Sequence, residues 1–295
     1  MTIATTSADL PSTAEPQPAA PRPAARRRLP RPGLADLSLA LAVVVVGVVL
    51  AWALVPGLFT AHDPVTGVPA EKLTPPGLAH PFGTDALGRD LLARVVHGSV
   101  HSVSGALIAV TVGLVVGTAL GVLAGSAGRV VDDVLMRAVD VLLSIPALLL
   151  MLSIIILLGF GTTNAAIAVG VSSVASFARL ARSEVVRVRR ADYVEAAFGS
   201  GGRFLPVLWR HVLPNSVSAV VSLAALQFGT AIIAISTLGF LGYGAPPPTP
   251  EWGLLISEGR NYIATAWWLT TLPGLVLVAV VLSANRISVA LRRTS

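Results

Sequence analysis

Five stretches of this sequence carry no charged residue over lengths that a membrane-spanning helix requires. A bilayer core about 30 Å thick needs about 20 apolar residues, each rising about 1.5 Å. Four stretches predict one crossing each, at residues 37–55, 102–128, 216–241 and 261–285. The fifth, residues 141–178, has no charge for 38 residues. As a helix it would be roughly 57 Å long, so it predicts two crossings with a turn at the Gly- and Thr-rich residues 159–164. We therefore expect an all-α polytopic membrane protein with six transmembrane helices.

The composition supports this class and excludes others. Only 12% of the residues are charged and 54% are hydrophobic, whereas an ordinary soluble domain is about 25% charged. The chain has no cysteine, which excludes disulfides, thiolate metal sites and a cysteine nucleophile. Its single lysine, Lys72, follows Glu71, so the Gly-Lys-Ser/Thr element of a phosphate-binding loop is absent. The chain is therefore not expected to be an ATPase or another enzyme.

The basic residues predict the orientation, since Lys and Arg gather in the cytoplasmic loops of membrane proteins. Seventeen of the 21 Lys and Arg residues fall on the side that holds both termini, and seven of them lie between the fourth and fifth crossings. We therefore expect a multi-pass protein of the bacterial cytoplasmic membrane with cytoplasmic N- and C-termini. The net charge of +6 follows from this sidedness, and no nucleic-acid partner is predicted.

The first 33 residues differ in composition from the rest of the chain. They are rich in Pro, Ala, Ser and Thr and end in arginines, which predicts a disordered cytoplasmic tail at 1–33. We expect the first transmembrane helix at 34–58, an extracytoplasmic segment at 59–99 and a five-helix core at 100–290, with a cytoplasmic loop at 180–213. A secretory signal peptide is the alternative, because Ala51-Trp52-Ala53 resembles a cleavage site. An apolar run of 19 residues is long for a signal, so an anchored helix is favoured.

Polar residues within the predicted helices supply the candidates for a transport pathway. No ionisable side chain lies near the middle of a crossing, which disfavours a transporter driven by protons or ions. Gln227 is hard to place in lipid because its amide offers two donors and an acceptor, so it faces either a partner helix or a water-filled path. Ser236 and Thr237 are further pathway candidates on the same helix.

Two histidines and two prolines have local implications. His97 and His101 are four residues apart and share a helix face. The Glu that zinc hydrolases carry between two such histidines is missing, so no metal site is predicted. Pro146 and Pro273 lie inside the third and sixth crossings, where proline kinks a helix.

The one sizeable polar segment on the cytoplasmic side, residues 179–211, contains the signature of a short helix. Asp192 and Glu195 resemble a capping box at a helix start. Ala196 and Ala197 then leave a smooth surface that another protein can approach closely. Glycines follow and should end the helix, at Gly199, Gly201 and Gly202. The segment predicts a short helix across the end of the bundle, and an amphipathic connector resting on lipid headgroups is the alternative to a docking element.

The spacing in this segment resembles a known family. Glu195-Ala196-Ala197, followed by Gly201 and then by His211-Val212-Leu213-Pro214, is similar to the EAA loop of ABC importer permeases. In that family the loop is a coupling helix that docks in a groove of the ATPase subunit. The resemblance implies that the ATPase-coupling residues here are Asp192, Tyr193, Glu195, Ala196, Ala197, Gly201, His211, Leu213 and Pro214. Relatives have larger apolar residues where this chain has Gly199 and Ser200, so we expect a shorter helix or a weaker apolar contact.

Further segments are similar to the C-type subunit of dipeptide, oligopeptide and nickel permeases. They are residues 80–90, 238–242, 247–253 and 257–260, and the resemblance covers about residues 36–286. It implies the transmembrane domain of a type I ABC importer, forming half of a pathway for peptides or a similar small solute.

The same resemblance implies a set of partners. They are the lipid bilayer, a homologous B-type permease, two cytoplasmic ATPases that bind ATP and Mg, and an extracytoplasmic solute-binding protein. No cofactor is expected on this chain. The alternatives are nickel or another non-peptide solute, a secondary transporter, and a passive membrane scaffold.

Overall fold

The computed structural model describes residues 34–294, where the regular elements are all helices. The expected tail at 1–33 lies outside the described residues. The longer helices are α1 (Leu34–Leu54), α2 (Leu91–Ser126), α3 (Arg129–Ser144), α4 (Ala147–Leu158), α5 (Thr162–Arg189), α8 (Leu213–Phe240) and α10 (Trp268–Thr294). The shorter ones are α6 (Asp192–Gly199), α7 (Phe204–Val207) and α9 (Trp252–Gly259). Single 3-10 turns lie at Pro56–Leu58, Pro69–Glu71 and Arg260–Tyr262, and a π-helical turn at Leu208–Val212.

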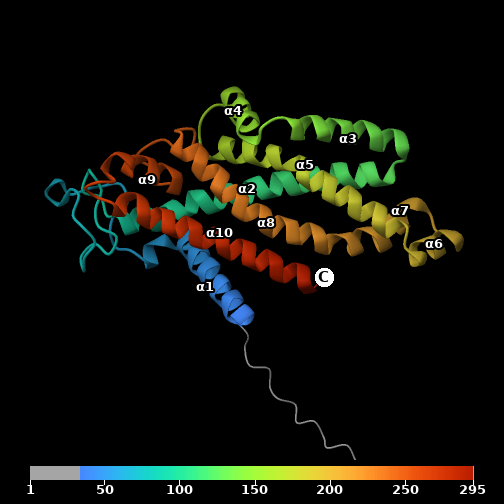
Figure 1. Ribbon diagram of the computed structural model, residues 1–295, viewed down its shortest axis with the longest axis horizontal. Helices are drawn as coiled ribbons and strands as arrows, with labels where there is room; N and C mark the ends of the chain where they lie inside the picture. The colour runs from blue at the N-terminus through green and yellow to red at the C-terminus, as the bar shows by residue number, and fades with distance from the viewer. Residues whose placement is uncertain (1–33, 295) are drawn as a thin grey trace, which may run out of the picture.

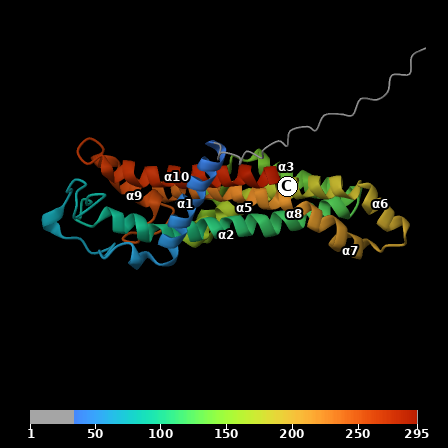
Figure 2. The ribbon, with the colours of Figure 1, turned by 90° about the horizontal axis from the view of Figure 1, so that it is seen from below.

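The helices form an elongated bundle with two different ends (Figure 1). One end carries α9 and the irregular segment between α1 and α2, and the opposite end carries α6 and α7, as a perpendicular view also shows (Figure 2). The main core lies between these ends and continues beneath α9. Ile155, Ile232 and Trp252 are fully buried in it.

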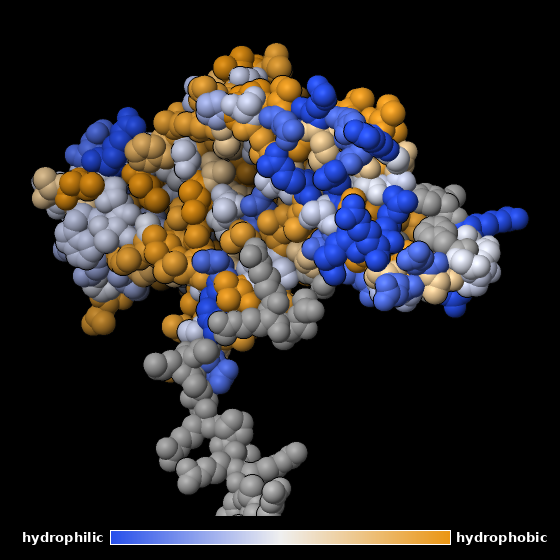
Figure 3. All heavy atoms as spheres, turned by 45° about the vertical axis from the view of Figure 1, so that its right-hand side comes forward, coloured by the Kyte–Doolittle hydropathy of each residue, from blue (hydrophilic) through white to orange (hydrophobic). Residues whose placement is uncertain are grey.

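The middle of the bundle has a hydrophobic outer surface, as contact with lipid requires. Large apolar side chains are exposed there on several helices, for example Leu41 on α1, Val115 on α2 and Leu275 on α10. Figure 3 shows hydrophobic residues over the middle and hydrophilic residues gathered toward the end with α6 and α7.

The number of crossings agrees with the six predicted from the sequence. Helices α1, α2, α5, α8 and α10 are each long and apolar enough to cross a membrane, and α3 with α4 makes a sixth crossing if this bent pair is counted as one. The pair is bent by 95° at the break that contains Pro146. The predicted kink is thus a break in the helix, because proline lacks an N–H and displaces the residue before it from helical geometry. Pro273 lies inside α10, which continues past it as one helix.

Several helices differ in extent from the charge-free stretches. α2 begins at Leu91, inside the expected extracytoplasmic segment, because Asp90 Oδ1 accepts the N–H of Ala93 at 2.6 Å and caps the helix. α5 continues to Arg189, so the first part of the expected loop is helical, and α10 begins only at Trp268. A charge-free stretch corresponds only to the part of a helix that lies in the hydrocarbon core of the bilayer. The helix itself can extend into the headgroup region, because charged side chains are solvated there.

Glycines on α2 let α5 pack directly against it. A Cβ atom added to Gly117 would lie 2.5 Å from the Cβ of Phe177, and one added to Gly121 would lie 2.4 Å from the carbonyl oxygen of Ala178. Small residues allow such close approach between membrane helices. This contact sets the rotation of α5 and leaves its other faces to α3, α4 and α8.

Candidate functional site

The expected coupling residues lie on α6 and in the segment that follows it. α6 begins at Asp192, and the carbonyl of Ala191 accepts the N–H groups of Val194 and Glu195 at 2.9 and 3.1 Å. The helix ends in a Schellman motif, since Gly201 has φ +88° and the N–H of Gly202 donates to the carbonyl of Ala197 at 3.0 Å. Gly201 thus occupies the left-handed position that glycine adopts most easily.

One side of α6 is anchored and the other is open. Val194 is fully buried and packs with Val185 and Val188 of α5 and with Val207. Asp192, Tyr193, Glu195 and Ala196 are all exposed. The helix is therefore attached to the end of α5 by an apolar contact while its acidic and small residues face outward.

The remaining coupling residues connect α6 to the next crossing. After α7, the π-helical turn at Leu208–Val212 leads directly into α8, whose first two residues are Leu213 and Pro214. Leu213 is half-buried against the same apolar cluster. Pro214 has no N–H and so cannot donate to the π-helical turn that precedes it. His211 belongs to the π-helical turn. The segment from α6 to Pro214 is one compact unit.

Several arginines counted as cytoplasmic charge have partners within the chain. Arg182 makes two hydrogen bonds to Asp132 of α3, at 2.5 and 2.6 Å. Arg189 Nη1 donates to the carbonyl of Gly125 at 2.7 Å and so caps the C-terminus of α2. These contacts join α5 to both neighbouring helices at the end that carries α6.

The three expected pathway residues do not share one surface. Gln227 lines a recess of about 240 Å³ between α2, α4, α5 and α8. Ser236 is buried, and its backbone lies close beneath Gly253 of α9. Thr237 is exposed and its hydroxyl donates to the carbonyl of Ile233 at 2.8 Å. Only Gln227 of the three faces this recess.

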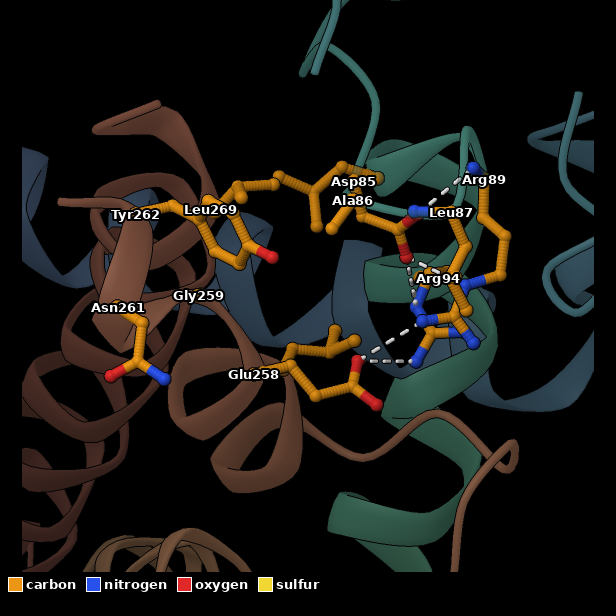
Figure 4. A pocket seen from close by; sticks show the side chains of 12 residues that line it. Asp85, Ala86, Leu87, Arg89, Arg94, Glu258, Gly259, Asn261, Tyr262 and Leu269 are labelled. Carbon is orange, nitrogen blue, oxygen red and sulfur yellow. Dashed lines mark hydrogen bonds and ion pairs between the residues drawn. The ribbon is translucent and has the colours of Figure 1, made fainter. Parts of the chain in front are cut away.

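The opposite end contains a buried ionic network that the sequence did not single out as a site (Figure 4). Arg94 is fully buried, and its Nη2 donates to Glu258 of α9 at 3.0 Å. Arg89 donates to Asp85 at 2.6 Å and to Glu258 at 3.3 Å. The four side chains line a cavity of about 290 Å³ together with Tyr262. The only sign of this network in the sequence is a pair of arginines five residues apart near a helix start. Nothing in the sequence indicates that these two side chains are buried.

Two further acidic residues are buried at this end. Glu251 caps α9 by accepting the N–H groups of Gly253 and Leu254 at 2.9 and 3.1 Å, and burial raises the pKa of its carboxyl above the usual range. Asp90 Oδ2 lies 2.8 Å from His80 Nδ1. Within residues 34–294 no group of three or more His, Cys, Asp or Glu side chains could hold a metal ion, and His97 Nδ1 instead lies 2.9 Å from the carbonyl oxygen of Ala93.

Comparison with known sequences gives matches over most of the chain. Residues 117–294 match the family model described as the binding-protein-dependent transport system inner membrane component. The dipeptide transport system permease protein DppC of Alkalihalophilus pseudofirmus is 39% identical over 235 residues, which are 80% of this chain and 77% of that protein. The probable D,D-dipeptide permease protein DdpC of Escherichia coli is 38% identical over 253 residues, 85% and 84% of the two chains. The glutathione permease protein GsiD of Pectobacterium atrosepticum is 37% identical over 217 residues, 74% and 72%.

Solved structures share the fold. A chain of the inward-facing MetNI methionine ABC transporter aligns with a TM-score of 0.55 at 18% identity, covering 67% of this chain and 96% of that one. A chain of an amino acid ABC transporter crystallised with histidines aligns with a TM-score of 0.55 at 14% identity, covering 68% and 94%. At these identities the likeness extends to the arrangement of the helices and no further.

Proposed function

The chain belongs to the binding-protein-dependent transport system inner membrane components and is the permease subunit of an ABC importer, and we propose that its solute is a short peptide. The relatives named above transport dipeptides, D,D-dipeptides or glutathione. These solutes share amide and carboxylate groups, which hydrogen-bonding side chains such as Gln227 can bind. The chain forms half of the translocation pathway, and a homologous B-type permease forms the other half.

The energy for transport comes from partner ATPases that bind ATP and Mg, and α6 is the element that receives it. The observation that carries this assignment is the two-sided character of α6. Its outward residues Tyr193, Glu195 and Ala196 are free to enter a groove of an ATPase, while Val194 is locked against α5. A rigid displacement of α6 therefore moves α5 and the start of α8 together.

The remaining assembly follows from this orientation. Two ATPases dock at the cytoplasmic end that carries α6, which places both termini of the chain in the cytoplasm. The opposite end, with α9 and the segment between α1 and α2, faces an extracytoplasmic solute-binding protein. No cofactor is held by the permease itself.

Uptake of a labelled dipeptide into proteoliposomes tests the function, with the complete transporter reconstituted and ATP inside. We expect Glu195→Lys to abolish uptake and lower substrate-stimulated ATP hydrolysis, because it reverses a charge on the exposed docking surface. Ala197→Trp should have the same effect, because Ala197 is half-buried and packs against the apolar cluster that anchors α6. Asp133→Lys is the matched control, since Asp133 is an exposed carboxylate on α3 at the same end. Co-purification of the subunits shows whether each complex assembles. Wild-type uptake by Glu195→Lys would refute the assignment of α6.

A further inference from the structure

Two adjoining cavities follow the groove between α5 and α8 and meet at Ser176. The first is the recess of about 240 Å³ that contains Gln227. The second, about 600 Å³, lies nearer the end with α6 and is lined by Ser176, Arg179, Ser183 and Ser222. Ser176 lines both cavities. The two spaces therefore continue from the centre of the bundle toward its α6 end.

The polar side chains on α5 are arranged along one face. Ser172, Ser176, Arg179 and Ser183 follow one another at steps of four, three and four residues, which places them on the same side of a helix. Residues that pack against the glycines of α2, such as Ala178, lie on another face. The glycine contact thus turns a polar stripe of α5 toward the cavities.

Two groups at the junction lack a partner within the described residues. The Ser176 hydroxyl makes no hydrogen bond to any of them, and neither does the Gln227 Nε2 amide, whose Oε1 accepts the hydroxyl of Thr230 at 3.1 Å. The nearby Ser172 hydroxyl instead donates to the carbonyl of Val169 at 2.7 Å. Both side chains are half-buried, so the hydroxyl and the amide can hydrogen-bond to a solute that enters the cavities.

The break in the third crossing lies over this junction. Leu143, before the break, lines the larger cavity, and Ala147, after it, lines the smaller one. A straight helix would present one continuous side to α5, whereas the bend at Pro146 turns α4 away from the direction of α3. The break therefore leaves the Ser176 junction between the two segments.

We propose that the two cavities form this subunit's side of the path for the peptide, with Ser176 and Gln227 as contact residues. The proposal rests on the proposed function and names the side chains that the solute touches. The Gln227 amide donates to a peptide carbonyl, and the Ser176 hydroxyl bonds to the next amide group. Arg179 lies at the α6 end of the path, where its Nη2 now donates to Asp140 at 2.7 Å. Because both side chains are more than half exposed, a substrate carboxylate can replace Asp140 on this guanidinium.

Cysteine accessibility tests this path, since the chain contains no cysteine of its own. Ser176→Cys is treated with a charged methanethiosulfonate reagent in the complete transporter, and modification is measured by the mass of this chain. We expect modification that a dipeptide substrate slows several-fold. Ser236→Cys is the control on α8, buried away from the recess, and should react several-fold more slowly. A Ser176→Cys thiol no more reactive than that of Ser236→Cys would overturn the proposal.

A second pair of variants tests transport itself. Ser176→Phe should block dipeptide uptake in an assembled complex that still hydrolyses ATP, while Leu275→Phe, on the exposed apolar surface of α10, should retain uptake. Uptake at the wild-type rate by Ser176→Phe would overturn the path but leave the proposed function intact. Failure of the wild-type transporter to take up any dipeptide would instead refute the proposed function.

Discussion

Arg94 and Glu258 form a hydrogen-bonded ion pair of 3.0 Å that joins the first turn of α2 to α9, across 164 residues of sequence. Arg94 is fully buried and Glu258 is 31% exposed. Burying a charge is unfavourable unless a partner compensates it. The pair therefore holds α9 in place over the start of α2, at the end opposite to α6.

Replacing Glu258 should destabilise this end of the molecule. Glu258→Gln leaves the buried guanidinium of Arg94 without its main counter-charge, and we expect a loss of about 2 kcal/mol in the free energy of unfolding in detergent, below the value for a fully buried pair because Glu258 is partly exposed. The control is Glu71→Gln, since Glu71 is 46% exposed and its contact to His80 is 3.4 Å. It should lose less than about 1 kcal/mol. Equal losses in denaturant titrations would contradict this account.

The buried carboxyl of Glu251 should make stability depend on pH. Burial raises its pKa in the folded protein, so its contribution is fully present below the pKa of the unfolded chain and is lost as pH rises through the folded pKa. Glu251→Gln cannot ionise, although its amide oxygen can still accept one N–H of α9. We expect the Tm of the wild type relative to this variant to fall as pH rises above about 4, the ordinary pKa of a glutamate. Parallel Tm profiles for the two proteins would show that ionisation of Glu251 has no such effect.

The glycine contact between α2 and α5 should be intolerant of a methyl group. Gly117→Ala places a Cβ 2.5 Å from Phe177 Cβ and from the carbonyl oxygen of Val174, and we expect a loss of about 1–3 kcal/mol in the free energy of unfolding. Gly47→Ala is the control, because a Cβ there on α1 has no neighbour within 4 Å. It should be neutral or stabilising by up to about 1 kcal/mol. The free energy of unfolding of both variants is measured by denaturant titration. Equal values for the two variants would refute the close contact between α2 and α5.

The two glycines near the end of α6 should differ in their tolerance of alanine. Gly201→Ala forces a side chain into a backbone with φ +88°, at a cost of about 1–2 kcal/mol, and should reduce uptake several-fold by loosening α6. Gly199→Ala adds a Cβ in open space within the helix and should retain uptake. Dipeptide uptake and ATP hydrolysis are measured for both variants. Wild-type uptake by Gly201→Ala would mean that the Schellman turn is not needed for coupling.

Much of the fold could be read from local sequence. The charge-free stretches predicted six crossings, because the thickness of the hydrocarbon sets the minimum length of each apolar run. The Glu195-Ala196-Ala197 and Gly201 pattern predicted a short helix followed by a glycine stop, since capping depends on neighbouring residues only. Helix ends were less well predicted, as with α2, which Asp90 extends beyond its charge-free part.

The functional surfaces depended on tertiary structure. Arg182 with Asp132, Arg94 with Glu258, and Ser176 beside Gln227 come from distant parts of the sequence. A long charge-free run indicates that a helix spans the membrane, but it does not specify which face of the helix meets a neighbour, because lipid is apolar on every side. In this protein, the glycine contact of α2 with α5 and the break at Pro146 determine which faces of these helices meet. The sequence by itself determined the crossings and the short cytoplasmic helix, and packing alone determined which polar side chains share a cavity.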